Sequence, residues 1–459
     1  MQHLFPATLA VSILAASPAP AQTVQDLQRQ IDELKAVIAE MKAERAQVAA
    51  PAPVAAAPTS PPPAPERLAA APVPKRKPWY ERITLRGYTQ LRLNEILSGD
   101  RTAPDGVARL RSVHDGGIGD NTGFTFRRIR LVLQGDLNDR VSFYLQPDFA
   151  QNVANQSVGE RREGFLQLRD AYADVFLDAD KRVRLRFGQS KIPYGWEDLQ
   201  SSGNRLTLDR ADAINSAVPS ERDIGVVAYY TPAATQAIWD RLGKEGQKLF
   251  GNYGAFGLGV FNGQGVNREE SNDAVMVTAM ATWPFALDGL GGAFAGQVLE
   301  VGGSALHNRV QPELRGGGVS AVPFTEERIA LHAILYPQPF GLQAEWNWGR
   351  GPEYDRALRR IVDRRLSGGY VQAMARVARS PLGPFMPYAR WQRYEGGWKA
   401  ALNAPPLDTE EVELGIEFHP WEPIELTIAY AEMERAEADE RRIGRAEGSL
   451  LRTQLQWNY

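Results

Sequence analysis

Cysteine is absent from this chain of 459 residues, and histidine occurs only five times. Without cysteine there is no disulfide framework and no thiolate metal site, which suits a protein that crosses an oxidising compartment. The histidines are scattered and lack the spacing of metal ligands. We therefore expect no metal site and no cofactor, and no constellation of residues indicates an enzyme.

Long apolar runs are also missing. Beyond the N-terminus, no segment approaches the roughly 18 consecutive apolar residues that a membrane-spanning helix requires. The net charge of −3 argues against a protein that binds nucleic acid. Neither feature excludes a membrane protein, because strands that alternate polar and apolar residues average out in hydropathy.

Three segments precede the main domain. Residues 1–21 are predicted to be a signal peptide, because an apolar run leads to the small-x-small site Ala19-Pro20-Ala21, although Lys and Arg are absent before it. Residues 22–47 repeat apolar side chains at steps of three and four, which predicts a coiled coil; a solvated amphipathic helix is the alternative. Residues 48–78 are rich in Pro and Ala and should form an extended linker.

The main domain, residues 79–459, repeats segments of alternating polarity between clusters of Gly, Pro, Asn and Asp. Sixteen of these segments are predicted to be strands: 82–94, 125–136, 140–149, 165–178, 181–189, 222–231, 251–262, 274–285, 293–302, 326–336, 341–350, 367–380, 384–394, 409–419, 424–434 and 449–459. An even number of strands is typical of a single-chain outer-membrane barrel. Tight turns such as Asn138-Asp139 should alternate with long loops such as Leu97–Asn121, Trp196–Glu221 and Gly303–Glu326.

The segment from Phe126 to Gly135 shows the alternation best. Ile129, Leu131 and Leu133 share one face of a strand, and Arg128, Arg130 and Gln134 share the other, because successive side chains point to opposite faces. In a soluble sandwich the apolar face would form the core. In a membrane barrel it would face lipid, and the arginines would line a pore.

The end of the chain favours the barrel. Its last predicted strand alternates strictly and finishes on an aromatic residue, Tyr459, which is similar to the assembly signal of bacterial outer-membrane barrels. We therefore predict an all-β fold, a sixteen-stranded antiparallel transmembrane β-barrel in the outer membrane. The N-terminal coiled-coil helix, on its Pro-rich linker, should lie in the periplasm.

The main domain resembles the phosphate-selective porin O/P family. The resemblance is clearest in four motifs: Arg86-Gly87-Tyr88-Thr89-Gln90-Leu91-Arg92, Phe126-Arg127-Arg128-Ile129-Arg130, Leu185-Arg186-Phe187-Gly188-Gln189-Ser190-Lys191 and Gly259-Val260-Phe261-Asn262-Gly263. It implies a trimeric barrel of sixteen strands that passes phosphate or polyphosphate, guided by arginine and lysine side chains in its lumen.

The resemblance implies lumenal basic residues at the Arg127-Arg128 pair and on the strand of Arg186, and an acidic one at Asp170. Strand parity adds others, whereas Arg127 itself has the parity of the apolar face. The candidate site residues are Arg86, Arg92, Arg127, Arg128, Arg130, Asp170, Arg184, Arg186, Lys191 and Arg390. Arginine keeps its charge and offers a planar fork that fits phosphate oxygens.

Several alternatives stay open. Glu411, Glu413 and Glu417 have lumenal parity, so the arginines either guide anions or brace the wall through these carboxylates. The segment 196–221 is either a constriction loop or an external loop. The predicted function is passive diffusion of small anions, with phosphate or polyphosphate the best candidates. A general diffusion porin and a tether that joins the outer membrane to peptidoglycan through residues 22–78 are the alternatives. The expected partners are membrane lipid and a homotrimer, and no nucleic acid.

Overall fold

A computed structural model describes residues 78–99, 110, 118, 122–152, 163–270, 272–381, 383–436 and 445–459. The predicted signal peptide, the coiled coil and all of the linker except residue 78 lie outside these residues and stay predictions. Among the described residues, no helix combines the length and the apolar character needed to cross a bilayer.

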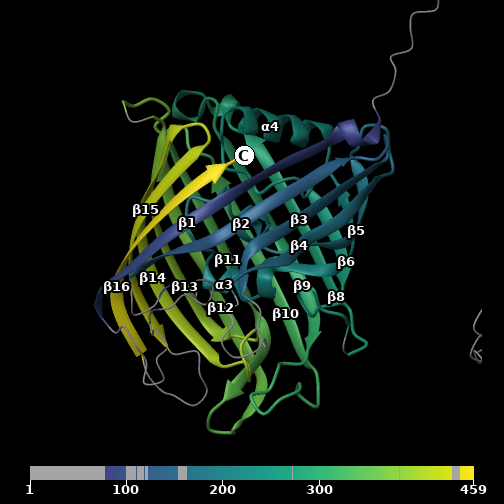
Figure 1. The fold of residues 1–459 in the computed structure, drawn as a ribbon, viewed down its shortest axis with the longest axis vertical. Helices are drawn as coiled ribbons and strands as arrows, with labels where there is room; N and C mark the ends of the chain where they lie inside the picture. Colours follow the sequence, from purple (N-terminus) through teal and green to yellow (C-terminus); the bar gives the residue numbers. More distant parts are fainter. Residues whose placement is uncertain are drawn as a thin grey trace, which may run out of the picture. The chain divides into compact units, whose positions relative to one another are not determined.

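The main domain is a closed antiparallel barrel in which each strand pairs with its neighbours in sequence and the first pairs with the last (Figure 1). Its strands are β1 Ile83–Gly99, β2 Gly123–Asp136, β3 Val141–Asn152, β4 Glu163–Phe176, β5 Val183–Lys191, β6 Arg222–Tyr230, β7 Phe256–Phe261, β8 Met276–Ala286, β9 Val298–Val310, β10 Phe324–Leu335, β11 Phe340–Asp355, β12 Arg360–Ala375, β13 Phe385–Gly397, β14 Pro406–Trp421, β15 Ile424–Ala436 and β16 Arg445–Asn458. All sixteen predicted strands are confirmed, with shifted boundaries. Among the described residues, every strand therefore has a hydrogen-bonded neighbour on both sides.

The alternation of polarity decides which side chains enter the barrel. On β2, Arg128 and Arg130 are buried, whereas Phe124 and Phe126 are among the most exposed large side chains of the protein. Other exposed apolar residues, including Leu258, Leu331, Leu342 and Leu414, also lie on strands. The outer surface is therefore apolar and the interior polar, as a barrel in lipid requires.

The terminal aromatic residue helps to close the barrel. The backbone N–H of Tyr459 donates to the carbonyl of Gly87, and the N–H of Gly87 donates to the carbonyl of Tyr459. A Cβ atom at position 87 would lie 2.5 Å from the Tyr459 ring and 2.3 Å from the carbonyl oxygen of Arg130. Glycine is therefore required where β1 meets both β2 and the end of β16.

A β-bulge turns Arg127 inward. Gln90 of β1 pairs with Arg128 and Leu91 pairs with Phe126, so Arg127 is the extra residue. An extra residue re-aims the side chains of the bulged strand, and the guanidinium of Arg127 reaches a carboxylate inside the barrel. The parity argument against Arg127 was therefore wrong, because it assumed an uninterrupted strand.

The two ends of the barrel differ. Short connections such as residues 137–140 and 177–182 lie at the end that also holds the start of β1 and the end of β16, which we call the termini end. The opposite end, the loop end, carries longer connections. The long loop predicted for Gly303–Glu326 is shorter than expected, because β9 continues to Val310 and β10 begins at Phe324.

The longest connection at the termini end breaks this pattern. Residues 231–255, between β6 and β7, contain helix α4, Ala233–Lys244, which lies at the same end of the barrel as the C-terminus in Figure 1. No helix is predicted here from the sequence. Its buried residues Thr235, Trp239 and Leu242 follow the spacing of one helical face, which is the signal that could have revealed it.

Candidate functional site

The connection between β5 and β6, residues 192–221, lies inside the barrel, and we call it the inner loop. It contains the short helices α2, Trp196–Leu199, α3, Asp212–Asn215, and η2, Pro219–Glu221. Most of its side chains are buried, including Tyr194, Trp196 and Ile214. Of the two alternatives for this segment, the inward one is therefore observed.

Inward side chains of β9 and β11 hold the first part of the inner loop. The Glu345 carboxylate accepts hydrogen bonds from the backbone N–H of Trp196 at 2.6 Å and of Glu197 at 3.0 Å. The Tyr194 hydroxyl donates to Asn347 at 2.6 Å, and the N–H of Gly195 donates to Ser304 at 3.0 Å. These bonds satisfy loop backbone groups that would be costly to bury alone.

Two predicted site residues serve the loop itself. The Lys191 ammonium donates to the carbonyls of Asp198, Leu199 and Gln200, at 2.8, 3.2 and 2.7 Å. The Arg390 guanidinium of β13 makes two bonds to the Glu197 carboxylate, at 2.6 and 3.1 Å. Burial opposes the charge of Glu197, but Arg390 outweighs it and holds the pKa of this carboxyl below its usual value. Both cations thus brace the inner loop.

The remaining predicted residues divide into two groups. Arg92, Arg127 and Arg128 lie where the inner loop meets β1 and β2. The Arg128 guanidinium donates to Gln90 at 2.8 Å, and the amide of Gln90 donates to the carbonyl of Ser202 in the loop at 3.1 Å. The second group borders a cavity between the inner loop and the wall.

This cavity has a volume of about 980 Å³ and follows the wall from β1 to β5. It takes in six of the predicted site residues: Arg86, Arg130, Asp170, Arg184, Arg186 and Lys191. Ser201, Gly203 and Asn204 of the inner loop bound it on one side. Arg82, Asp136 and Lys181 also border it, which places its mouth at the termini end.

Most cavity arginines already have a carboxylate partner. Arg186 makes two bonds to Asp174, at 2.8 and 2.9 Å, and its Cζ lies 3.7 Å from the centre of the Tyr172 ring. Arg130 bonds Asp148 at 2.8 Å. Arg86 differs, because it is exposed and its described hydrogen bond is a long one, 3.3 Å, to Gln134. The bracing alternative is therefore true of several arginines, but with aspartates as partners.

Arg222, at the start of β6, belongs to the same cavity and was not assigned to the site. It bonds Asp170 at 2.8 Å and also pairs with Glu221 of the inner loop. Arg169 of β4 was missed as well. Gln146 pairs with Asp170 and Pro147 with Leu168, so Arg169 is a bulge residue that is buried against parity. A bulge leaves no clear signal in a single sequence.

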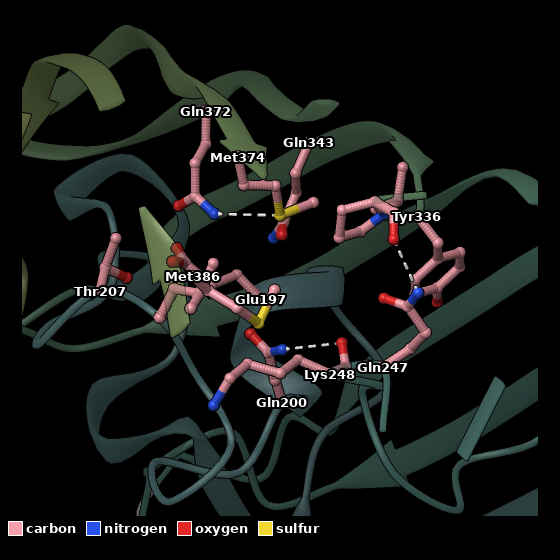
Figure 2. Close-up of a pocket in the computed structure, with 13 residues that line it drawn as sticks. Glu197, Gln200, Thr207, Gln247, Lys248, Tyr336, Gln343, Gln372, Met374 and Met386 are labelled. Carbon is pink, nitrogen blue, oxygen red and sulfur yellow. Dashed lines mark hydrogen bonds between the residues drawn. The ribbon is translucent and has the colours of Figure 1, made fainter. Parts of the chain in front are cut away.

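Apolar side chains fill part of the interior beside the cavity. Trp239 and Leu242 of α4 and Phe250 pack with Trp196 and Leu199 of the inner loop in one apolar cluster. Figure 2 shows the boundary between the two segments, where Gln200 of the loop donates to the carbonyl of Lys248. The space left there is about 20 Å³, room for about one water molecule.

Glu300 of β9 joins both inner segments to the wall. Its carboxylate accepts four hydrogen bonds: from the indoles of Trp196 and Trp239, at 3.0 and 2.9 Å, and from the hydroxyls of Thr282 and Tyr336, both at 2.8 Å. All four donors are neutral and buried. One carboxylate therefore fixes the inner loop and α4 together.

Replacing Glu300 by Ala should detach both segments. Four buried donors would lose their acceptor, and we expect the free energy of unfolding to fall by about 3 kcal/mol or more. Trypsin should also cleave α4 faster, at Arg241 or Lys244. Urea unfolding in detergent micelles and limited proteolysis measure the two effects. Glu327→Ala on β10, where the carboxylate side chain is 46% exposed, is the control. Equal stability of the two variants would contradict the role assigned to Glu300.

Asp198 in the inner loop should make stability depend on pH. Burial raises its pKa to about 7, and neither of its oxygens accepts a hydrogen bond from the described residues. Because the folded state then holds a proton that the unfolded state releases, the free energy of unfolding should fall as pH rises from about 4 to about 7. Asp198→Asn should weaken this decrease, measured by urea unfolding across that range. The control is Asp240→Asn on the exposed face of α4. If the free energy of unfolding of the two variants depends on pH in the same way, Asp198 is not the group responsible.

Comparisons with known proteins agree with the geometry. The family model described as phosphate-selective porin O and P matches residues 106–459. A search of curated proteins found no match. Among solved structures, the outer membrane channel DcaP of Acinetobacter baumannii is 16% identical with a TM-score of 0.50, over 82% of this chain and 97% of that one. An anion-selective porin from Comamonas acidovorans is 12% identical with a TM-score of 0.47, over 82% of this chain and 99% of that one.

The family model spans β2 to β16. The chain therefore belongs to the phosphate-selective porin O and P family, and it is a β-barrel porin of the bacterial outer membrane.

Proposed function

We propose that this porin lets small anions diffuse passively across the outer membrane, with phosphate or polyphosphate the favoured substrates, and that the cavity along β1 to β5 is part of their route. One observation carries the proposal. Eight basic side chains line the cavity but only four acidic ones. The basic residues are Arg82, Arg86, Arg130, Lys181, Arg184, Arg186, Lys191 and Arg222, and the acidic ones are Asp136, Asp170, Asp174 and Asp180.

The pairing of these charges suits conduction better than tight binding. A channel needs sites that attract an ion but release it again. Asp174 is shared by Arg186, at 2.8 Å, and Arg184, at 3.6 Å, so a passing anion meets guanidiniums whose charge is only partly compensated. Arg86 offers donors near the mouth.

The carboxylates of the opposite wall do not line this cavity. Glu345 is bonded to the inner loop, and Tyr388 donates to Glu413 at 2.8 Å. Glu417 pairs with Lys248 at 2.8 Å. We infer that this separation of charge produces a field across the lumen that draws anions toward β1 to β5.

We infer that the termini end faces the periplasm, because outer-membrane barrels have their short turns there. Residues 22–47 would then lie in the periplasm, where a coiled coil could join the chains of a homotrimer. The tether to peptidoglycan remains the second candidate, and it rests on residues 22–78 alone. Deleting those residues separates the two: lost cohesion of the cell envelope with unchanged phosphate uptake would favour the tether.

Arg86 and Arg184 provide the test of anion preference, because neither makes a short bond to a carboxylate of the described residues. Replacing both by Ala should lower the anion-to-cation permeability ratio several-fold, since two of eight cations leave the cavity while the barrel stays folded. Reversal potentials in planar bilayers under a salt gradient, with chloride and then phosphate, measure the ratio.

Arg350→Ala is the matched control, because this exposed arginine lies on β11 outside the cavity. A parent protein that prefers cations would overturn the proposed function. A parent without preference would establish the general diffusion porin instead. Equal ratios for the double variant and the control would remove the cavity arginines from the selectivity mechanism.

A further inference from the structure

Three neighbouring strands aim a guanidinium at one carboxylate of the inner loop. Arg92 of β1 lies 3.1 Å from Asp209, Arg127 of β2 lies 3.4 Å from it, and Arg452 of β16 is also paired with it. In the closed barrel β1 lies between β2 and β16 (Figure 1). The three arginines therefore form one continuous basic patch, which we call the basic wall.

The basic wall is held in place by groups other than Asp209. The Nε and Nη2 atoms of Arg92 both donate to the amide oxygen of Gln454, at 3.1 and 2.7 Å. The Nε of Arg452 donates to Asn94 at 3.2 Å. The bulge in β2 aims Arg127 inward. Strand residues thus help to orient Arg92 and Arg452, and the bulge orients Arg127.

Two further arginines add positive charge beside the patch. Arg205 of the inner loop donates to the carbonyl of Leu208 at 3.3 Å, and Arg92 donates to the same carbonyl at 3.0 Å. Arg128 bonds the neutral side chain of Gln90. Within the described part of the chain, neither Arg128 nor Arg205 has an ion pair with a carboxylate.

Asp209 is well suited to be an exchangeable anion. Burial opposes its charge, but Arg92, Arg452 and Arg127 outweigh it and hold the pKa of this carboxyl well below its usual range. It is therefore ionised at any physiological pH. It lies in a stretch without helix or strand, between Leu208 and α3. A carboxylate on irregular chain can leave its site without unfolding a secondary-structure element.

We propose that the basic wall is an oxyanion-binding site which Asp209 fills from within, and that free phosphate competes with this carboxylate and releases the inner loop from β16, β1 and β2. The planar guanidinium group can donate two parallel hydrogen bonds to the oxygens of a phosphate or of a carboxylate, so one set of arginines can bind either anion. The tethered carboxylate is a competitor at high effective concentration. Phosphate thus regulates the width of the lumen that it crosses, and this step rests on the proposed anion route.

The first test is isothermal titration calorimetry, which measures the binding of sodium phosphate to the full-length protein in detergent micelles. Asp209→Asn removes the internal competitor and keeps the side-chain shape, so affinity should rise on the order of tenfold or more. Asp209→Glu keeps the competitor and should bind like the parent. Asp240→Asn makes the same charge change on the exposed face of α4 and is the control. Equal affinity of Asp209→Asn and this control would overturn the proposal.

A single introduced cysteine reports release of the loop. Because the protein has no other cysteine, every labelled thiol is the introduced one. Ser202→Cys places it at a buried loop position whose carbonyl is bonded to the wall. Its reaction with a maleimide should be slow in chloride, faster in phosphate, and fast without phosphate when combined with Asp209→Asn. A rate unaffected by phosphate and by Asp209→Asn would refute loop release.

The variant Arg127→Ala provides a second test if Asp209→Asn does not fold. Arg127→Ala removes the most accessible guanidinium of the basic wall, whose side chain is 19% exposed, and should weaken phosphate binding and speed thiol labelling. Unchanged binding and labelling in Arg127→Ala would also overturn the proposal. Neither assay needs ion flow. A cation-selective bilayer current would therefore reject the proposed function alone, whereas unchanged binding and labelling in an anion-selective porin would reject this inference alone.

Discussion

The structure depends on one requirement, which is that charged and polar groups enclosed by the barrel must find partners. The strands deliver arginines and carboxylates to the interior because their side chains alternate, and the inner loop carries backbone groups that cannot reach bulk water. The charged side chains of the strands and the backbone groups of the inner loop are each other's hydrogen-bonding partners. Glu345 receives loop N–H groups, Lys191 donates to loop carbonyls, and Arg390 pairs with Glu197. Leaving any of these groups alone would cost about 1–3 kcal/mol or more.

This mutual satisfaction also shapes the route through the barrel. On the side of β9 to β13, the inner loop and α4 pack against the wall and share Glu300, so little space is left. On the side of β1 to β5, aspartates pair with the arginines and a cavity remains. The proposed selectivity and the closure of one side of the lumen thus rest on the same arrangement of charges. The charges that hold the loop are of the same kind as those that would meet a passing anion, which makes competition between loop and substrate physically reasonable.

Bulges add a second device to the alternating pattern. Arg127 and Arg169 each occupy an extra position in a strand and are turned inward beside an inward neighbour. Two adjacent residues can then face the lumen, which a regular strand forbids. Arg127 gains contact with Asp209 in this way. A regular β2 would have placed its charge against lipid, at a cost that depends on depth and is greatest at the bilayer midplane.

Alternating polarity by itself determined the barrel, its sixteen strands and the inward direction of Arg86, Arg128, Arg130 and Arg186, because side-chain direction in a strand is a local property with a period of two. The tertiary structure alone decided that residues 192–221 lie inside, that α4 packs against the inner loop and that Arg390 and Lys191 support the loop. It also decided the inward turn of Arg127 and its meeting with Arg92, Arg452 and Asp209. Asp209 and Arg452, for example, are 243 positions apart. The periodicity of a single strand carries no information about which distant group will pack beside it.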